Sequence, residues 1–180
     1  MGRTVRSRIV MNGNPDGGEC QVDAKRILRD SMRRMRRELP DRERRSAIIA
    51  EHLVALPALA AASRVMAYKA VLGEVDPVSV VGWLRARGVD VRMPEDDVSP
   101  DWPDAIIVPG TAFTLKGQRL GQGGGWYDRF LQGRRKDALT IGIGFEPQVV
   151  DIVPTDVHDI ELDCIVSEVG PTWTHRRTTP

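Results

Sequence analysis

Apolar residues near the start of the chain recur at the three- and four-residue spacing of amphipathic helices. A first helix is expected to begin near Asp23 and to end at Pro40. Its inward stripe consists of Ile27, Leu28, Met32, Met35 and Leu39. A second helix is expected to end near Pro57, and its stripe consists of Ile48, Ile49, Leu53 and Leu56. The arginines of the first helix are expected to face solvent.

The pattern then changes to short apolar runs bounded by Gly, Pro and Asp, which is typical of buried strands. Strands are expected over residues 65–68, 89–93, 105–108, 140–145 and 163–167. Between the first two runs, Asp76 and Pro77 have the residue types of a helix N-cap and a first helical position, so a helix is expected from there to Gly88. A shorter helix is expected from Trp126 to about Leu131.

Strands and helices alternate along the chain, and the central strands are continuous apolar runs. This combination is typical of a parallel sheet that is covered by helices. We therefore expect an α/β fold in three layers, with a mostly parallel sheet and helices on both faces. Ligands of such sheets bind beyond the carboxyl ends of the strands. The loops after Tyr68, Val108 and Phe145 are accordingly expected to border one cleft.

One domain accounts for the whole series of elements, and we expect it to occupy residues 22–170. Residues 1–21 contain several Arg, Gly and Asn residues but lack the apolar stretch of a secretory signal. We expect a flexible tail over residues 1–21 and a second one over residues 171–180.

Composition and charge exclude several classes of protein. The chain is 41% hydrophobic and 28% charged, as in ordinary globular proteins. Its net charge of +1 gives no overall attraction to nucleic acid or to anionic membranes. No apolar run approaches the roughly 20 residues of a membrane span. Cys20 and Cys164 lack the spacing of a metal site and suit a reducing compartment, so we expect a cytoplasmic protein. We also expect a monomer.

Positive charge is concentrated in the first predicted helix and just beyond it. Basic residues occupy positions 25, 26, 29, 33, 34, 36, 37, 42, 44 and 45, with few acids between them. A solvated helix face explains such a run. A contact surface for phosphate groups or nucleic acid explains it as well.

The most informative stretch is a glycine-rich loop at residues 117–129, between the clearest strand and a short helix. Gly121, Gly123, Gly124 and Gly125 suit a loop whose backbone N–H groups all turn toward one anion. The following helix would add its own N–H groups. The loop is neither a Walker A motif nor a dinucleotide fingerprint, because the Lys-Ser/Thr pair and the third glycine are missing. A phosphate group is the expected ligand, although a flexible turn would also accommodate these glycines.

An acid directly after this loop raises the question of a metal ion. Asp128 would repel a phosphate unless a divalent cation lay between them, and Mg²⁺ binds through one or two carboxylates plus phosphates. A second acidic stretch would place Asp159, Glu161 and Asp163 on one face of a strand. Helix capping explains Asp128 equally well, and a solvated edge explains the second group.

The ordered set of motifs resembles the 5-formyltetrahydrofolate cyclo-ligase (5,10-methenyltetrahydrofolate synthetase) family. The main resemblance lies in residues 106–113 and in the glycine-rich loop. Weaker resemblances, in the same order as in the family, lie at 25–29, at Tyr68 with 74–76, at 142–148 and at 158–163. Taken together, the resemblance covers roughly residues 25–170 and implies a fold similar to the NagB/RpiA/CoA-transferase-like fold. It also implies ATP- and Mg²⁺-dependent closure of 5-formyltetrahydrofolate to 5,10-methenyltetrahydrofolate, with ADP and phosphate as products.

The resemblance also implies roles for individual residues. ATP is expected to contact Lys25, Arg26, Ile27, Leu28, Arg29, Arg119, Leu120, Gly121, Gln122, Gly123, Gly124, Gly125, Trp126 and Tyr127. The reduced folate is expected to contact Arg29, Lys69, Glu74, Gln122, Gly123, Gly124, Gly125 and Trp126. Lys25 and Arg29 are the expected catalytic residues, and Asp128 and Asp159 are the expected Mg²⁺ ligands.

One stretch departs from the family pattern. The stretch from 95 to 104 contains fewer residues than the corresponding family segment, part of which shapes the folate site. This departure and the arginine-rich helix each leave one alternative to the cyclo-ligase open. The chain could be a nucleotide-binding relative with another small substrate or a regulatory role. It could instead be a nucleic-acid-associated protein that uses its arginine-rich helix, although we expect no nucleic-acid or membrane partner.

Overall fold

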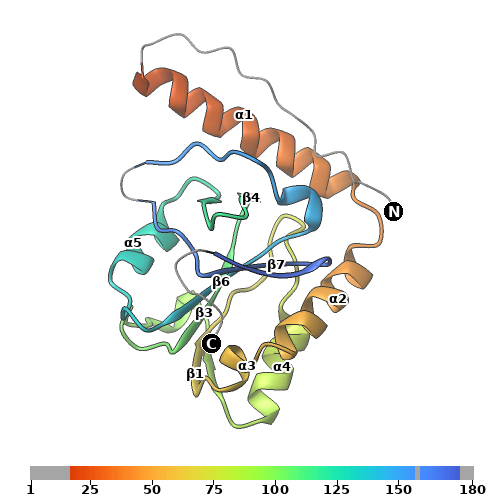
Figure 1. The fold of residues 1–180 in the computed structure, drawn as a ribbon, viewed down its shortest axis with the longest axis vertical. Coiled ribbons are helices and arrows are strands. Elements are labelled where there is room, and N and C mark those ends of the chain that lie inside the picture. Colours follow the sequence, from red (N-terminus) through yellow and green to blue (C-terminus); the bar gives the residue numbers. More distant parts are fainter. Residues whose placement is uncertain (1–16, 157–158, 175–180) are drawn as a thin grey trace.

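The computed structural model describes residues 17–156 and 159–174, and a six-stranded sheet forms its centre (Figure 1). The strand order is β2-β1-β3-β6-β7-β8. The strands are β1 (Arg64–Met66), β2 (Asp90–Arg92), β3 (Ala105–Pro109), β6 (Leu139–Ile143), β7 (Cys164–Ser167) and β8 (Gly170–Trp173). All pairs are parallel except β7 with β8. The expected mostly parallel α/β sheet is confirmed.

Helices cover both faces of this sheet. On one face lie α2 (Arg42–Val54), α3 (Pro57–Ala60) and α4 (Val78–Ala86), and their apolar side chains pack with Ile107 of β3. On the other face lies α5 (Trp126–Gln132), which packs with Ile106 of the same strand. Successive residues of β3 thus enter opposite cores, which explains why this strand is apolar throughout.

A long helix, α1 (Gly17–Glu38), lies apart from the helices on the two sheet faces (Figure 1). It packs on a small hairpin of β4 (Ala112–Phe113) and β5 (Arg119–Leu120), where Leu28 and Met32 meet Ala112 and Leu120. This hairpin was not expected from the sequence, because two residues per strand give no detectable alternation. It positions the start of the glycine-rich loop beneath α1.

Several boundaries differ from expectation. Residues 17–21 belong to α1 and residues 171–173 belong to β8, although flexible tails were expected at both positions. Thr174 is also described and is buried, and residues 1–16 and 175–180 lie outside the described residues. Pro77 is the N-cap of α4, and Asp76 accepts a hydrogen bond from the N–H of Val78 at 3.0 Å. The segment from Asp159 to Asp163 is not a strand, so its acids do not share a strand face.

The solvent-facing stripe of α1 also differs from expectation. Ile27, expected to be buried, is 52% exposed, whereas Arg36, expected to face solvent, is completely buried. No helix within residues 17–156 and 159–174 is both long and apolar enough to cross a membrane.

Candidate functional site

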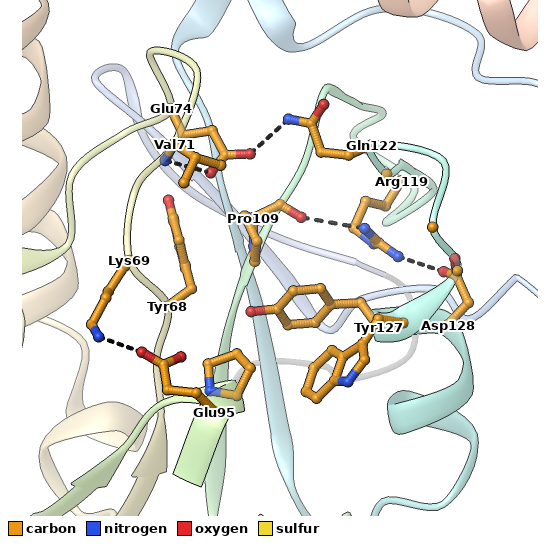
Figure 2. Close-up of a pocket in the computed structure, with 15 residues that line it drawn as sticks. Tyr68, Lys69, Val71, Glu74, Glu95, Pro109, Arg119, Gln122, Tyr127 and Asp128 are labelled. Atoms are coloured by element: carbon orange, nitrogen blue, oxygen red, sulfur yellow. Dashed lines mark hydrogen bonds and ion pairs between the residues drawn. The ribbon is translucent and has the colours of Figure 1, made fainter. Parts of the chain in front are cut away.

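A cavity of about 380 Å³ lies beyond the carboxyl ends of β1, β2 and β3 (Figure 2). One wall comes from the loop that joins β1 to α4 and contributes Tyr68, Lys69 and Glu74. A short 3-10 helix, η1 (Pro94–Asp96), contributes Pro94 and Glu95. The opposite wall is the glycine-rich loop with the first turn of α5. The volume is that of a small-molecule site, and its place is the one expected for a parallel sheet.

The loop after Phe145, which was also expected to border the cleft, does not line the cavity. Phe145 is completely buried and does not line the cavity. Gln148, in the 3-10 helix η2 (Glu146–Gln148), donates from Nε2 to the carbonyl oxygens of Gly110 and Thr111 at 3.0 Å each. This loop therefore fixes the backbone just after β3 instead of contacting a ligand.

The glycine-rich loop keeps its main chain accessible. Gly123 and Gly125 have φ values of 112° and 66°, in the left-handed region that favours glycine. A Cβ atom on Gly124 would meet nothing within 4 Å. Among the described residues, the N–H groups of Gly121 through Gly124 donate to no protein acceptor. These N–H groups thus remain available as donors, and their binding of an anion stays a prediction.

Arg119 and Asp128 form an ion pair inside this wall (Figure 2). The Arg119 side chain is 4% exposed and also donates from Nη1 to the carbonyl oxygen of Pro109 at 3.3 Å. Its guanidinium carbon lies 5.7 Å from the centre of the Tyr127 ring, within cation–π range. The loop therefore presents a buried cation to the cavity, next to the carboxylate that was expected to bind Mg²⁺.

Tyr127 places a phenol in the same wall. Its hydroxyl is buried and has no hydrogen-bond partner within the described part of the chain. In Figure 2 the ring extends from α5 toward Tyr68 and Pro109. Tyr68 is already satisfied, because its hydroxyl donates to the carbonyl oxygen of Val75 at 2.6 Å. Buried polar groups usually have partners, so the Tyr127 hydroxyl is a candidate ligand contact.

Burial raises the pKa of both phenols, and Tyr68 and Tyr127 are the two tyrosines of the chain. In the unfolded chain both should ionise near pH 10, about the ordinary tyrosine value. Because the pKa of each phenol is higher in the folded protein than in the unfolded chain, the folded state holds these protons more tightly. The free energy of unfolding should therefore be constant below about pH 10 with respect to these groups and should fall as the pH rises above it. Phenolate absorbance should therefore appear together with loss of circular dichroism. Ionisation of either tyrosine in the folded protein near pH 10 would contradict the buried geometry.

The first helix reaches the glycine-rich loop from outside the cavity. Arg29 donates from Nε to the carbonyl oxygen of Gly121 at 2.9 Å. Arg33 donates from Nη2 to the carbonyl oxygen of Gln122 at 3.2 Å and to its Oε1 at 3.0 Å. Leu28 is buried under the loop, whereas Arg26 and Ile27 are exposed. Of residues 25–29, expected at the ATP site, Arg29 thus contacts the loop, but none lines the cavity.

The two acids expected to bind Mg²⁺ lie in different cavities. Asp128 lines the main one, while Asp159 lines a second cavity together with Asp156 and Gln118. Lys25 bridges Asp156 and Asp159, with Nζ–Oδ2 distances of 2.6 and 3.3 Å. No group of three or more His, Cys, Asp or Glu side chains within the described ranges could hold a metal ion. Asp163, the third acid of that stretch, is buried, and its Oδ2 accepts hydrogen bonds from Thr140.

Most of the residues expected at the folate lie around the main cavity. Glu74 accepts a hydrogen bond from Gln122 Nε2 at 2.8 Å, which joins the two walls, and Lys69 pairs with Glu95 (Figure 2). Gly124, Gly125 and Trp126 also line it, whereas Gly123 does not. The lining residues that were not predicted are Tyr68, Val71, Pro94, Glu95 and Pro109. Both Tyr68 and Pro109 could have been found, because Tyr68 ends one predicted strand and Pro109 directly follows another.

Comparisons with known proteins agree with this arrangement. Residues 99–168 match the family model of the 5-formyltetrahydrofolate cyclo-ligase family. The chain is 36% identical over 95 residues to a Saccharomyces cerevisiae 5-formyltetrahydrofolate cyclo-ligase, covering 48% of this chain and 45% of the relative. It is 35% identical over 86 residues to the mouse protein of that name, covering 46% and 41%. The chain thus spans less than half the length of these curated relatives.

Solved structures are similar over a larger part of the chain. The 5,10-methenyltetrahydrofolate synthetase of Aquifex aeolicus superposes with a TM-score of 0.74 at 26% identity, covering 87% of this chain and 95% of that one. A synthetase of the same name from Mycoplasma pneumoniae has a TM-score of 0.72 at 24% identity, covering 80% and 98%, and supports the fold. The resemblance to the cyclo-ligase family is confirmed.

Proposed function

We propose that the chain, which carries the 5-formyltetrahydrofolate cyclo-ligase motifs, closes 5-formyltetrahydrofolate to 5,10-methenyltetrahydrofolate at the cavity between Glu74 and the glycine-rich loop. ATP would supply the driving force and become ADP and phosphate. The observation that carries the proposal is the loop itself: the N–H groups of Gly121 through Gly124 have no protein acceptor among the described residues, and the buried Arg119 lines the same cavity as Gly121, Gln122 and Gly124. These are the donors that a transferring phosphoryl group requires.

The chemistry explains why such donors would be sufficient. A formyl oxygen is a poor leaving group until it is phosphorylated. Its attack on the γ-phosphorus of ATP releases ADP, and N10 of the folate then attacks the formyl carbon as phosphate leaves and the N10 proton is lost. This route requires that the two substrates be held in line, and it requires no nucleophile from the protein.

The phosphate chain of ATP and the folate would bind at two different ends of the cavity. Gly121 through Gly125 and Arg119 would bind the phosphate chain. Glu74 and Gln122, which join the two walls, would bind the folate, because their carboxylate and amide can pair with ring N–H and C=O groups. The buried hydroxyl of Tyr127 would donate to a substrate oxygen at the same end.

Mg²⁺ would be held by Asp128 together with phosphate oxygens, because such sites need few protein carboxylates. Asp128 fits this role in part, since it lines the cavity and is 30% exposed while paired with Arg119. When bound, the ion would neutralise charge on the transferring phosphoryl group. Asp159, in the second cavity, fits less well in this conformation.

The decisive experiment mixes the purified chain with 5-formyltetrahydrofolate, ATP and Mg²⁺. We expect the absorbance of the methenyl product to rise, with one ADP released per product and no reaction when either ATP or Mg²⁺ is omitted. Absence of product at enzyme concentrations comparable to those of the substrate would contradict the proposal.

A nucleotide-binding relative with another small substrate is the second candidate. The short segment that contains η1 favours it, because Pro94 joins the main cavity to an open groove lined by Val98, Trp126 and Phe130. A thermal-shift experiment separates the two functions. Stabilisation by ATP without stabilisation by 5-formyltetrahydrofolate would favour the relative, whereas stabilisation by both favours the cyclo-ligase.

Substitution of Asp128 by Asn tests the metal assignment. The amide keeps an oxygen for Arg119 but removes the negative charge, so we expect kcat to fall about a hundredfold and the Mg²⁺ requirement to rise. The melting temperature should change by only a few degrees, because the amide oxygen can still accept a hydrogen bond from the buried Arg119. Asp159→Asn is the matched control and should cost less than about tenfold in kcat. Equal losses would indicate that both acids share the ion in the bound state.

A further inference from the structure

Arg36 is a completely buried arginine that the proposed chemistry does not use. It lies on α1, one turn after Arg33 and on the same face of the helix. Both side chains contact residues of the cavity walls, Arg33 contacting Gln122 and Arg36 facing Glu74. Arg36 Nη1 lies 3.8 Å from Glu74 Oε1 and 3.5 Å from the carbonyl oxygen of Gly110. Its Nε and Nη2 atoms are buried without a hydrogen-bond partner in the described residues.

This arrangement is a poor source of stability. A buried guanidinium remains charged, and removing it from water is costly unless several hydrogen bonds compensate. Burial lowers the pKa of Arg36, although the nearby Glu74 carboxylate opposes this effect. An apolar side chain of similar size would fill this position without the free-energy cost of removing a charge from water. The charge therefore calls for an explanation in the group that it faces.

That group is Glu74, whose side chain is 4% exposed and lines the cavity. Its Oε1 accepts from Gln122 Nε2 at 2.8 Å, and its Oε2 accepts from the N–H of Val71 at 3.2 Å. Gln122 is held in turn by Arg33. Arg36 is thus the cation that faces a buried carboxylate at the junction of both walls.

We propose that Arg36 is a positioning residue that holds the Glu74 carboxylate toward Gln122 and the cavity, and thereby sets the affinity for the folate. The inference rests on the proposed function. Arg36 does not line the cavity, so it acts through Glu74 and touches neither substrate. Loss of Arg36 frees Glu74 to turn away, which weakens folate binding while the phosphate-binding part of the loop keeps its other contacts.

The test measures the KM values of both substrates for Arg36→Met in two backgrounds, the wild type and Glu74→Gln. In the wild-type background, the KM for 5-formyltetrahydrofolate should rise about tenfold or more, and the KM for ATP less than about twofold. In the Glu74→Gln background, the same substitution should change the folate KM less than about twofold, because no carboxylate remains to be held. Arg36→Lys keeps the positive charge and should restore part of the affinity.

Two controls make the outcome unambiguous. Arg37→Met removes the neighbouring exposed arginine of α1 and should leave both KM values unchanged. If Arg36→Met unfolds because Glu74 is left unpaired, Arg36→Lys is compared in the same two backgrounds. Equal effects in both backgrounds, or equal increases in both KM values, would overturn the positioning role while the proposed function stands. An inactive wild type would overturn the proposed function, and the inference with it.

Discussion

Substitution of Arg119 by Met is expected to lower kcat/KM for cyclisation about a thousandfold or more, while the protein still folds. The size of the loss follows from the charge that develops when a phosphoryl group is transferred, since one well-placed arginine can contribute this much. Arg119 is the buried cation in the wall of the cavity, and Tyr127 and Asp128 hold it there. Methionine fills a similar volume without the charge.

Folding should survive this substitution because the partner of Arg119 can reach water. Asp128 is 30% exposed, so its carboxylate would be rehydrated instead of being left buried and unpaired. Thermal unfolding with and without ATP separates the two effects: the melting temperature alone should fall little, but its increase on addition of ATP should disappear.

A graded control comes from Arg119→Lys, which keeps a charge but loses the two-pronged geometry that reaches both Pro109 and Asp128. It should retain more activity than the methionine variant. If Arg119→Met turned over at the wild-type rate with an unchanged KM for ATP, the assignment of the phosphate end of the cavity would be wrong.

Substitution of Gly117 by Ala is expected to have the largest effect on stability, about 3 kcal/mol or more. Gly117 has a φ of 90°, where a side chain is strained. A Cβ atom there would lie 2.4 Å from the carbonyl oxygen of Leu162, and this backbone atom cannot move aside easily. The N–H of Leu162 also donates to the carbonyl oxygen of Gly117 at 2.8 Å. The turn before β5 is therefore fixed against the segment that leads into β7.

Urea unfolding of Gly117→Ala, Gly82→Ala and the wild type measures this effect. Gly82 is exposed within α4, and a Cβ atom there would meet nothing within 4 Å. Alanine at that position should raise stability by about 0.5–1 kcal/mol, because glycine is the poorer residue inside a helix. A wild-type unfolding midpoint for Gly117→Ala would show that the loop adjusts without cost.

The site was only partly predictable because its lining comes from separate loops. The glycine-rich loop was visible as a local cluster, and the structure places it at the end of β3 as expected. Its partners on the other wall were visible only in part, since Glu95 lies in a short 3-10 helix without a sequence signal of its own. The roles assigned to individual residues at the ATP, folate and Mg²⁺ positions remain predictions.

The arginines of α1 show a second limit. A helical pattern assigns polar residues to the solvent face, and Arg34 and Arg37 are indeed exposed. Arg29 and Arg33 instead hold the glycine-rich loop, and Arg36 is buried against Glu74. The surface available for a nucleic acid is correspondingly smaller than the sequence indicated.

By itself, the sequence determined the order of the main strands and helices, the mostly parallel sheet and the place of the glycine-rich loop, because apolar period and glycine clusters are local properties of the chain. The tertiary structure alone decided which charges meet. Asp128 pairs with Arg119 across the glycine-rich loop, whereas Asp159 with Lys25 and Glu74 with Arg36 pair when distant segments pack together. Sequence spacing carries no record of such contacts, since they depend on which side chains the sheet, α1 and the hairpin bring close together.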